Sequence, residues 1–349
     1  MTPRFLVSIG GVTALIAIMV ATPPLSAQGP LVGTNKNEGA AKTYSPPRTT
    51  DGQPDLQGFW TNAGYAPLER PDNVTKEFYT PEEAAEFEKQ FVDTEAAQTE
   101  PGTNPDVHYD HTQFGLDRSV AGYSSNLRTS LIVDPSNGKL PPLSAEGRKR
   151  AAERAEAAKR MGGPYDAAQN LPLGARCLIM DRMGPPMLYG NYNNTYQIVQ
   201  EPGNVMILAE MLHDFRVVPL DGRPQLPPHV RQWIGSSRGH WEGDTLVVET
   251  TNFNGKNPFR GSSENMRLVE RFTRVDENTI RYQFTVDDPA TWTRPWSAEM
   301  PMKRTIGPIF EHACHEGNHS LYNILAGARA EEKRAQEAAK TESKKTESK

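Results

Sequence analysis

The chain contains only two cysteines, Cys177 and Cys314, among its 349 residues. Two cysteines are too few for a small fold built from disulfides or for a cysteine-rich zinc or iron–sulfur site. The sequence also lacks a large excess of either charge: 38 basic and 43 acidic residues give a formal net charge of −5. That charge provides no global field to attract nucleic acid, so we expect no nucleic-acid partner.

Motifs for the common cofactors are missing as well. The sequence has no Walker loop, no dinucleotide-binding glycine motif and no C-x-x-C-H for haem attachment. Cys177, Met180, Met183 and Met187 are soft donors, but Gly184-Pro185-Pro186 interrupts them, which disfavours a soft-metal site. We therefore predict that the protein uses no cofactor.

Long apolar runs are missing except at the amino terminus. Residues 1–4 carry one basic side chain, residues 5–21 are apolar, and a Pro-Pro break follows shortly before Ala27. This order is typical of a secretory signal that is cleaved after a small residue. The alternative is a membrane anchor, which the run of about 17 residues with its Gly-Gly interruption disfavours. We expect a periplasmic or secreted protein, without stable membrane insertion after signal cleavage.

An oxidising compartment makes a disulfide the expected state of Cys177 and Cys314. The bond would close a loop of roughly 137 residues and would stabilise the fold by about 4–5 kcal/mol in the chain-entropy model. The alternative is a pair of buried thiols.

Composition divides the chain into segments of different character. Thr80 with Pro81 marks the start of a helix over residues 80–98, and Ser144 marks the start of another over 144–161. The predicted segments are a signal peptide (1–27), a flexible leader (28–50), an irregular region with two helices (51–185), an antiparallel β domain with a closing helix (186–329) and a disordered charged tail (330–349).

Within the β domain the apolar residues alternate with a period of two, which is typical of strands. The predicted strands cover residues 195–200, 205–212, 215–220, 240–251 with a turn at 242–244, 266–275, 279–286, 297–302 and 309–315. This number of short strands predicts a mainly β fold, an antiparallel β-barrel or sandwich that is lipocalin-like in size. A barrel of about eight strands has room for one small ligand, so a small molecule is the predicted partner.

Four phrases in the chain carry a resemblance to known proteins. They are GHWEGDTLVVET (239–250), FRGSSE (259–264), VERFTRVD (269–276) and ACHEGN (313–318). The sequence resembles a large family of exported soil-bacterial proteins that are mostly described as hypothetical, from about Asp51 to Arg329. The resemblance implies export and a shared fold, and it implies no mechanism.

Gly235-Ser236-Ser237-Arg238-Gly239 matches the G-x-S-x-G pattern of serine hydrolases, and Asp287 or Asp288 with His315 would complete the order Ser, Asp, His. A hydrolase elbow needs a strand, a sharp turn and then a helix. Here a strand-like pattern follows the motif, so we interpret it as an ordinary turn.

His312, His315, Glu316 and His319 crowd into eight residues. On a helix they would share one face, as metal ligands require, whereas a strand would send His312 and His315 to opposite faces. The resembling family carries aromatic residues where His312 and His319 stand here. We therefore predict no metal, and a polar His315–Glu316 pair near the disulfide end at Cys314.

Two carboxylates fall on the apolar faces of predicted strands, Glu210 with Met206 and Leu208, and Glu270 with Leu268 and Phe272. An inward carboxylate has to be paired or protonated, because burial of an isolated charge is costly. The structural interpretation is an ion pair with one of several arginines. The functional interpretation is a general acid or base with a raised pKa at the floor of a ligand cavity. The possible arginine partners are Arg216, Arg260, Arg267 and Arg271.

Function stays open between classes. The first hypothesis is an exported enzyme that uses metal-independent acid–base chemistry as a lyase, isomerase or hydrolase; the others are a binding or carrier protein without catalysis and a structural envelope protein. In the enzyme, Glu210 or His213 would remove a proton, Arg260 would stabilise negative charge, and His315 would return a proton. The predicted catalytic residues are Glu210, His213, Arg260, Glu264, His315 and Glu316. The predicted ligand-binding residues, whose alternative is ordinary core packing, are Trp60, Tyr192, Asn193, Trp241, Trp292 and Trp296, joined by Tyr189 and Tyr196.

Overall fold

The computed structural model describes residues 44–97, 126–180, 183–190 and 192–347. The predicted signal peptide and most of the predicted leader lie outside these ranges. No helix within the described ranges is both long enough and apolar enough to cross a membrane.

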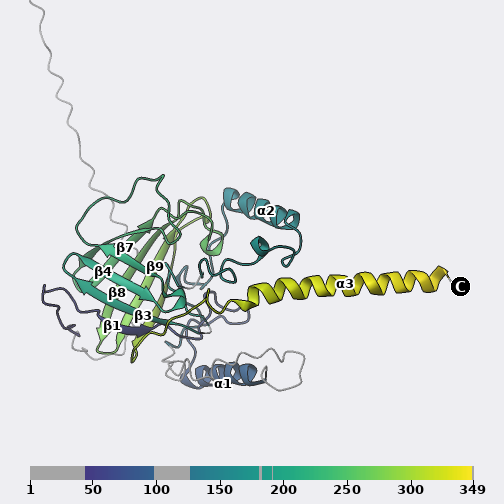
Figure 1. Ribbon diagram of the computed structural model, residues 1–349. Helices are drawn as coiled ribbons and strands as arrows, with labels where there is room; N and C mark the ends of the chain where they lie inside the picture. Colours follow the sequence, from purple (N-terminus) through teal and green to yellow (C-terminus); the bar gives the residue numbers. More distant parts are fainter. Residues whose placement is uncertain (1–43, 98–125, 181–182, 191, 348–349) are drawn as a thin grey trace, which may run out of the picture. The chain divides into compact units, whose positions relative to one another are not determined.

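One antiparallel sheet of ten strands curves into a nearly closed barrel (Figure 1). Its order is β5-β4-β3-β1-β10-β9-β8-β7-β6, and β2 pairs separately with β10. The predicted mainly β, antiparallel fold is therefore confirmed, and of the two predicted alternatives, barrel and sandwich, the structure is a barrel. The strands are β1 (Gly58–Thr61), β2 (Ile132–Asp134), β3 (Thr195–Glu201), β4 (Asn204–Ala209), β5 (Phe215–Pro219), β6 (Ser236–Glu242), β7 (Thr245–Thr251), β8 (Arg267–Asp276), β9 (Thr279–Asp287) and β10 (Trp296–Arg304).

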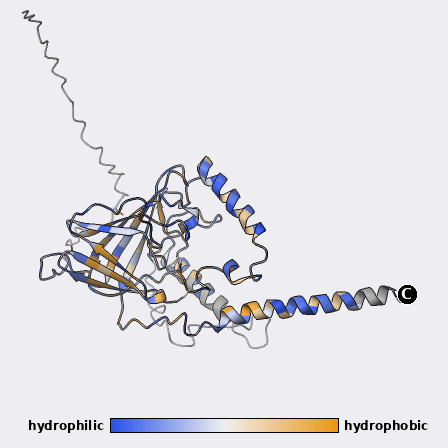
Figure 2. Ribbon diagram, turned by 45° about the horizontal axis from the view of Figure 1, so that its top comes forward, coloured by the Kyte–Doolittle hydropathy of each residue, from blue (hydrophilic) through white to orange (hydrophobic). Residues whose placement is uncertain are grey.

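Alternation along each strand fills the barrel with side chains. In β9 the buried residues Ile280, Tyr282, Phe284 and Val286 point to one face, because successive side chains of a strand point to opposite faces. Figure 2 shows the same contrast in hydropathy, with apolar segments along the strands and a mainly hydrophilic α2 (Ala145–Arg160). The barrel interior is therefore the protein's main core.

The end strands of the sheet, β5 and β6, meet at Gly239. A Cβ at this position would lie 2.7 Å from side-chain atoms of both Val218 and Leu220. Two side chains of β5 and its following turn thus occupy the space that a larger residue in β6 would need. Close packing at a glycine brings the two edges together and nearly closes the barrel.

Two expectations about the strands are corrected. Region 51–185 is not wholly irregular, since β1 inserts between β3 and β10, with Trp60 opposite both Tyr196 and Arg304. A strand of four residues is too short to show a period of two. No strand forms over residues 309–315: this segment is irregular, and its residues alternate only between exposed and half-buried, so it has no buried face to pair.

The helices begin where their capping residues predict. α1 (Pro81–Ala97) follows a capping box in which Thr80 Oγ1 accepts from Glu83 N at 3.2 Å and Glu83 Oε2 accepts from Thr80 N at 2.8 Å. Ser144 accepts from Gly147 N at 3.0 Å and caps α2. Short 3₁₀ turns lie at Ala168–Asn170, Met211–His213 and Phe259–Gly261.

The last helix, α3 (His319–Glu347), runs through most of the segment that composition assigns to a disordered tail. Alanine, glutamate, lysine and arginine dominate this segment, and these are strong helix formers. Intrinsic helix propensity accounts for helical structure there without packing against the barrel.

Candidate functional site

A charged network lies at the centre of the barrel. Glu270 of β8 is 0% exposed, and Arg216 of β5 binds both of its carboxylate oxygens, with Nη2 to Oε1 at 2.8 Å and a second bond from Nη1 to Oε2. The Tyr282 hydroxyl of β9 also donates to Glu270 Oε1, at 2.7 Å. Arg216 is thus the partner that the structural interpretation of Glu270 requires, and the buried carboxylate is fully engaged.

The network also holds a segment that enters the barrel, residues 183–190, which we call the inner segment. Tyr282 Oη accepts from Met187 N at 2.9 Å, and Met187 O accepts from Asn62 Nδ2 at 3.2 Å. Met183 and Met187 are buried together with the prolines between them. Because the inner segment covers Tyr282, we assign the Arg216–Glu270 pair a structural role.

Three buried tyrosines, one of them in the inner segment, are expected to resist deprotonation. Burial raises the pKa values of Tyr189, Tyr196 and Tyr282 above the ordinary value. Above about pH 10 the unfolded chain loses these protons while the folded protein keeps them, so stability falls as pH rises, by about 1.4 kcal/mol per pH unit for each tyrosine. Tyrosinate absorbance from pH 8 to 12 measures the deprotonation, and urea denaturation over the same pH range measures the loss of stability. Titration of all eleven tyrosines without unfolding would contradict the prediction.

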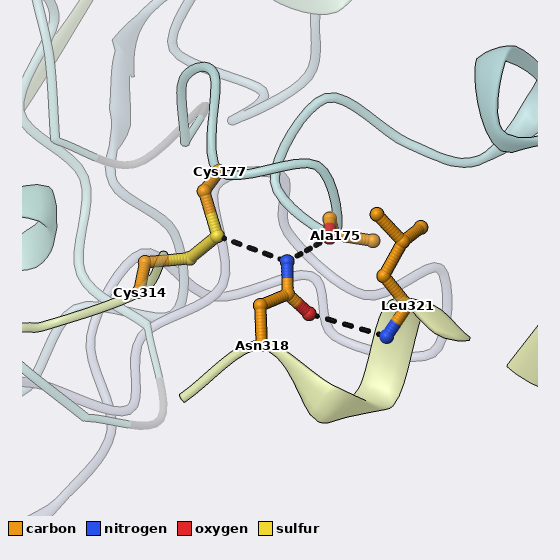
Figure 3. Close-up of a disulfide and its surroundings, with 5 residues drawn as sticks. All are labelled: Ala175, Cys177, Cys314, Asn318 and Leu321. Atoms are coloured by element: carbon orange, nitrogen blue, oxygen red, sulfur yellow. Dashed lines mark hydrogen bonds between the residues drawn. A yellow bond between two sulfur atoms is a disulfide. The ribbon is translucent and has the colours of Figure 1, made fainter. Parts of the chain in front are cut away.

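The predicted disulfide between Cys177 and Cys314 is present and joins the chain just before the inner segment to the segment before α3 (Figure 3). Asn318 supports it: its Nδ2 donates to Cys177 Sγ at 3.2 Å and to Ala175 O at 3.1 Å. Asn318 Oδ1 accepts from Leu321 N at 3.2 Å in the first turn of α3. The carboxy-terminal segment is thereby tied to the approach to the barrel.

Aromatic side chains surround a hollow beside the paired strands β1 and β10, which we call the aromatic hollow. It has an empty volume of about 560 Å³, including open solvent at its mouth. Five separate stretches of chain build it: the segment after β1, α1 with Tyr79 just before it, the residues before β2, the end of the inner segment, and β10. Its lining residues are Asn62, Ala63, Gly64, Tyr65, Ala66, Tyr79, Ala84, Phe87, Asn126, Arg128, Leu131, Tyr189, Met300 and Pro301.

Two local contacts hold the Tyr189 ring in place in the wall of the aromatic hollow. The Tyr189 hydroxyl donates to Ala66 O, and a Cβ at Gly64 would lie 3.2 Å from the Tyr189 ring. The segment after β1 therefore packs its backbone directly against this ring, which only glycine allows without displacement of the ring.

Arg128 is the charged residue of the lining, and acidic neighbours neutralise it. Its Nη1 lies 2.9 Å from Glu77 Oε1, its Nε lies 3.8 Å from Glu299 Oε1, and its guanidinium lies 4.9 Å from the centre of the Phe78 ring. Among its described lining residues, the aromatic hollow consequently presents ring faces and amides with no unpaired charge.

A second hollow, also lined mainly by apolar side chains, lies where the inner segment approaches the loop after β7. One of its two serines, Ser263, is already engaged by Asp288, with N–Oδ2 and Oγ–Oδ1 distances of 2.6 and 2.8 Å. Its lining residues are Ile179, Met180, Gly184, Pro185, Trp233, Ile234, Phe253, Gly255, Asn257, Pro258, Phe259, Ser262, Ser263 and Met266. This hollow offers little polar recognition.

Glu210 does not stand on the inward face of a strand. β4 ends at Ala209, and Glu210 is a buried turn residue whose carboxylate accepts from Thr195 N at 3.3 Å. His213, three residues later, is exposed, and its backbone N–H donates to the backbone carbonyl oxygen of Glu210. The apolar run thus contains a strand followed by a turn, which a period of two does not reveal.

The other predicted acid–base residues lie on exposed segments. Arg260 and Glu264 are exposed on the loop after β7, and Glu264 lies 3.6 Å from Arg231. His315 and Glu316 are exposed beside the disulfide. None of the six predicted catalytic residues lines either hollow.

The histidine cluster is dispersed. His312 stacks on Tyr192 with ring centroids 6.5 Å apart, and His319 begins α3. In the described part of the chain, no three His, Cys, Asp or Glu side chains are placed to hold a metal ion.

The predicted aromatic wall divides between core and surface. Trp60, Trp292 and Trp296 are buried in the core; Trp60 Nε1 donates to Leu56 O at 2.8 Å. Tyr192, Asn193 and Trp241 are partly exposed. Neither group lines a hollow, although the additional residue Tyr189 does. Sequence reasoning missed the rest of the aromatic hollow because its residues come from five distant stretches with no shared motif.

The G-x-S-x-G phrase is mostly strand rather than turn. Gly235, with φ of 72°, turns the chain into β6, where Ser237 is buried and its hydroxyl lies 2.8 Å from that of Thr250. A serine within a strand cannot form a hydrolase elbow, because the elbow requires a strand-to-helix turn.

Comparison with known proteins identifies no relative. No family model, curated protein or solved structure matches the chain. The resemblance drawn from the four sequence phrases therefore remains a prediction, and function has to be argued from geometry.

Proposed function

We propose that the protein binds a small, largely apolar ring compound in the aromatic hollow and acts as an exported binding or carrier protein. The observation that carries this proposal is the enclosure of one hollow by Tyr65, Tyr79, Phe87 and Tyr189. Binding sites for small molecules are typically concave and lined by aromatic side chains with a few polar groups. The aromatic hollow has this composition.

Ring faces recognise other rings by shape and quadrupole. Offset or edge-to-face aromatic pairs contribute about 0.5–1.5 kcal/mol each beyond the burial of their area. The four aromatic residues differ in origin: Phe87 comes from α1, Tyr79 from just before that helix, Tyr65 from the segment after β1, and Tyr189 from the inner segment. A flat ligand would contact several elements at once and would hold them together.

Binding is favoured over catalysis because the acid–base residues are not gathered around a hollow. General acid–base catalysis needs a proton donor or acceptor within hydrogen-bonding reach of the substrate. Five of the six predicted catalytic residues are exposed, and Glu210 is held by a backbone amide. The hypothesis of a lyase, isomerase or hydrolase remains a prediction without support from this geometry.

Export to the periplasm or the medium is part of the proposal. The Cys177–Cys314 disulfide supports it, because structural disulfides persist in oxidising compartments. The amino-terminal pattern of a secretory signal supports it independently, although that segment lies outside the described residues.

The variant Phe87→Ala tests the proposal. Removal of this ring from the hollow is expected to weaken binding of a one- or two-ring compound about 5–10-fold, since it removes one aromatic contact. Toluene, phenol, indole and naphthalene are suitable probes, with dissociation constants expected on the order of 0.1–1 mM and measured by ligand-detected NMR.

Phe215→Ala is the matched control, because Phe215 is 55% exposed on β5 and does not line the aromatic hollow. The Phe215→Ala variant is expected to bind the probe compounds with the same affinities as the wild type. The proposal fails if none of the probes binds the wild-type protein, or if the two variants weaken binding equally.

A further inference from the structure

We propose that the ligand of the aromatic hollow is uncharged and donates a hydrogen bond to Asn62 Oδ1. This inference rests on the proposed function and narrows it to a chemical class: a ring compound that carries an O–H or N–H group. Three observations carry it: the orientation of the Asn62 amide, its unpaired oxygen, and the charge balance of the lining.

The first observation is that the orientation of the Asn62 side chain is fixed. Asn62 follows β1 directly and is 1% exposed. Its amide approaches Met187 O within 3.2 Å. A carbonyl oxygen only accepts hydrogen bonds, so the amide atom that faces Met187 has to be the donor Nδ2. Oδ1 therefore lies on the other arm of the amide.

The second observation is that Asn62 Oδ1 is buried and accepts no hydrogen bond within the described part of the chain. Buried polar atoms are nearly always paired, and an unpaired one costs free energy that a ligand can recover. Asn62 also belongs to the lining of the aromatic hollow. A molecule in the hollow that brings a donor to Oδ1 would satisfy this oxygen, whereas a molecule without a donor would leave this buried oxygen unpaired.

The third observation concerns charge. Arg128 lines the hollow and is paired with Glu77 and Glu299, so an anionic ligand would have to compete with two carboxylates for it. A cationic ligand would face the Arg128 guanidinium in the same confined space. Both charged forms would also lose hydration on entry, which an apolar lining does not repay. A neutral donor, as in a phenol, an indole or an anilide, fits the lining.

The experiment compares phenol with toluene and anisole, on the wild-type protein and on Asn62→Leu. Toluene has the shape of phenol without the donor, and anisole has an oxygen that only accepts. For each protein we take the ratio of the phenol affinity to the toluene affinity and to the anisole affinity. Both ratios are expected to be about tenfold higher in the wild type than in Asn62→Leu, because the variant loses one buried hydrogen bond to phenol. Because each protein is compared with itself, a general loss of affinity in the variant does not imitate this result.

Tyr282→Phe serves as the control for the inner segment. It removes the hydrogen bond to Met187 N and leaves Asn62 intact, so the preference for phenol is expected to persist. If Asn62→Leu does not fold, the wild type decides alone: phenol has to bind about tenfold tighter than anisole.

Three outcomes overturn the inference. Equal affinities for phenol and anisole in the wild type would show that no donor is recognised, while binding of both would leave the proposed function standing. A preference for phenol that survives in Asn62→Leu would place the acceptor elsewhere. Failure of all three compounds to bind the wild type would overturn the proposed function, and the inference with it.

Discussion

The replacement of Arg216 with methionine is expected to lower the free energy of unfolding by about 3–5 kcal/mol, because it leaves the Glu270 carboxylate buried without its countercharge. Glu270 is 0% exposed, and after this change the Tyr282 hydroxyl would be the one side-chain group of the described residues that still donates to it. Methionine retains much of the length of arginine, so the loss of packing is small. Urea denaturation followed by tryptophan fluorescence and far-UV circular dichroism measures the change.

Two controls separate charge from packing. The double variant Arg216→Met with Glu270→Leu is expected to recover most of the lost stability, since a buried ion pair can be replaced by apolar residues at little cost. Arg267→Met removes the exposed pair with Glu249 and is expected to cost about 1 kcal/mol or less. A double variant as unstable as Arg216→Met would show that packing, rather than an unpaired charge, causes the loss.

Removal of the disulfide by the double variant Cys177→Ala and Cys314→Ala is expected to lower the free energy of unfolding by about 4–5 kcal/mol. The bond closes a loop of 137 residues, and its loss releases that loop in the unfolded chain. Urea denaturation of the variant, and of the wild type with and without reductant, measures the effect.

Hydrogen exchange gives this prediction a local readout. The Met187 amide, ten residues after Cys177, donates to buried Tyr282 Oη. If the disulfide also holds the inner segment in the barrel, this amide is expected to exchange faster in the double variant than amides at the centre of β9. An unfolding free energy within 1 kcal/mol of the wild type would show that the bond constrains the unfolded chain far less than its loop length implies.

The local elements follow from the sequence with close agreement. The hairpin of β8 and β9, predicted over 266–275 and 279–286, spans Arg267–Asp276 and Thr279–Asp287. α2 begins directly after its predicted cap, Ser144. Alternation, turn residues and caps act within a few residues of one another, so the chain carries their signal locally.

The partners of the long-range contacts do not follow from the sequence. Four arginines were possible partners for Glu270, and only the curvature of the barrel places Arg216 of β5 opposite β8. In the same way, an apolar run predicted as one strand over 205–212 ends at Ala209, where Glu210 turns the chain and meets the backbone of β3. Burial and pairing across distant strands decide such details.

By itself, the sequence determined a mainly antiparallel β fold and two capped helices, because these depend on local periodicity and caps, and it favoured the pairing of the only two cysteines, which have no other partner. The choice of a barrel over a sandwich came from the tertiary structure. Only the tertiary structure decided where a ligand can be held. The aromatic hollow joins residues from β1 to β10 that share no spacing, and the unpaired oxygen of Asn62 arises because its amide nitrogen is engaged by Met187, 125 positions away. Whether a polar atom has a hydrogen-bond partner depends on all its neighbours in space, and no local sequence pattern encodes these neighbours.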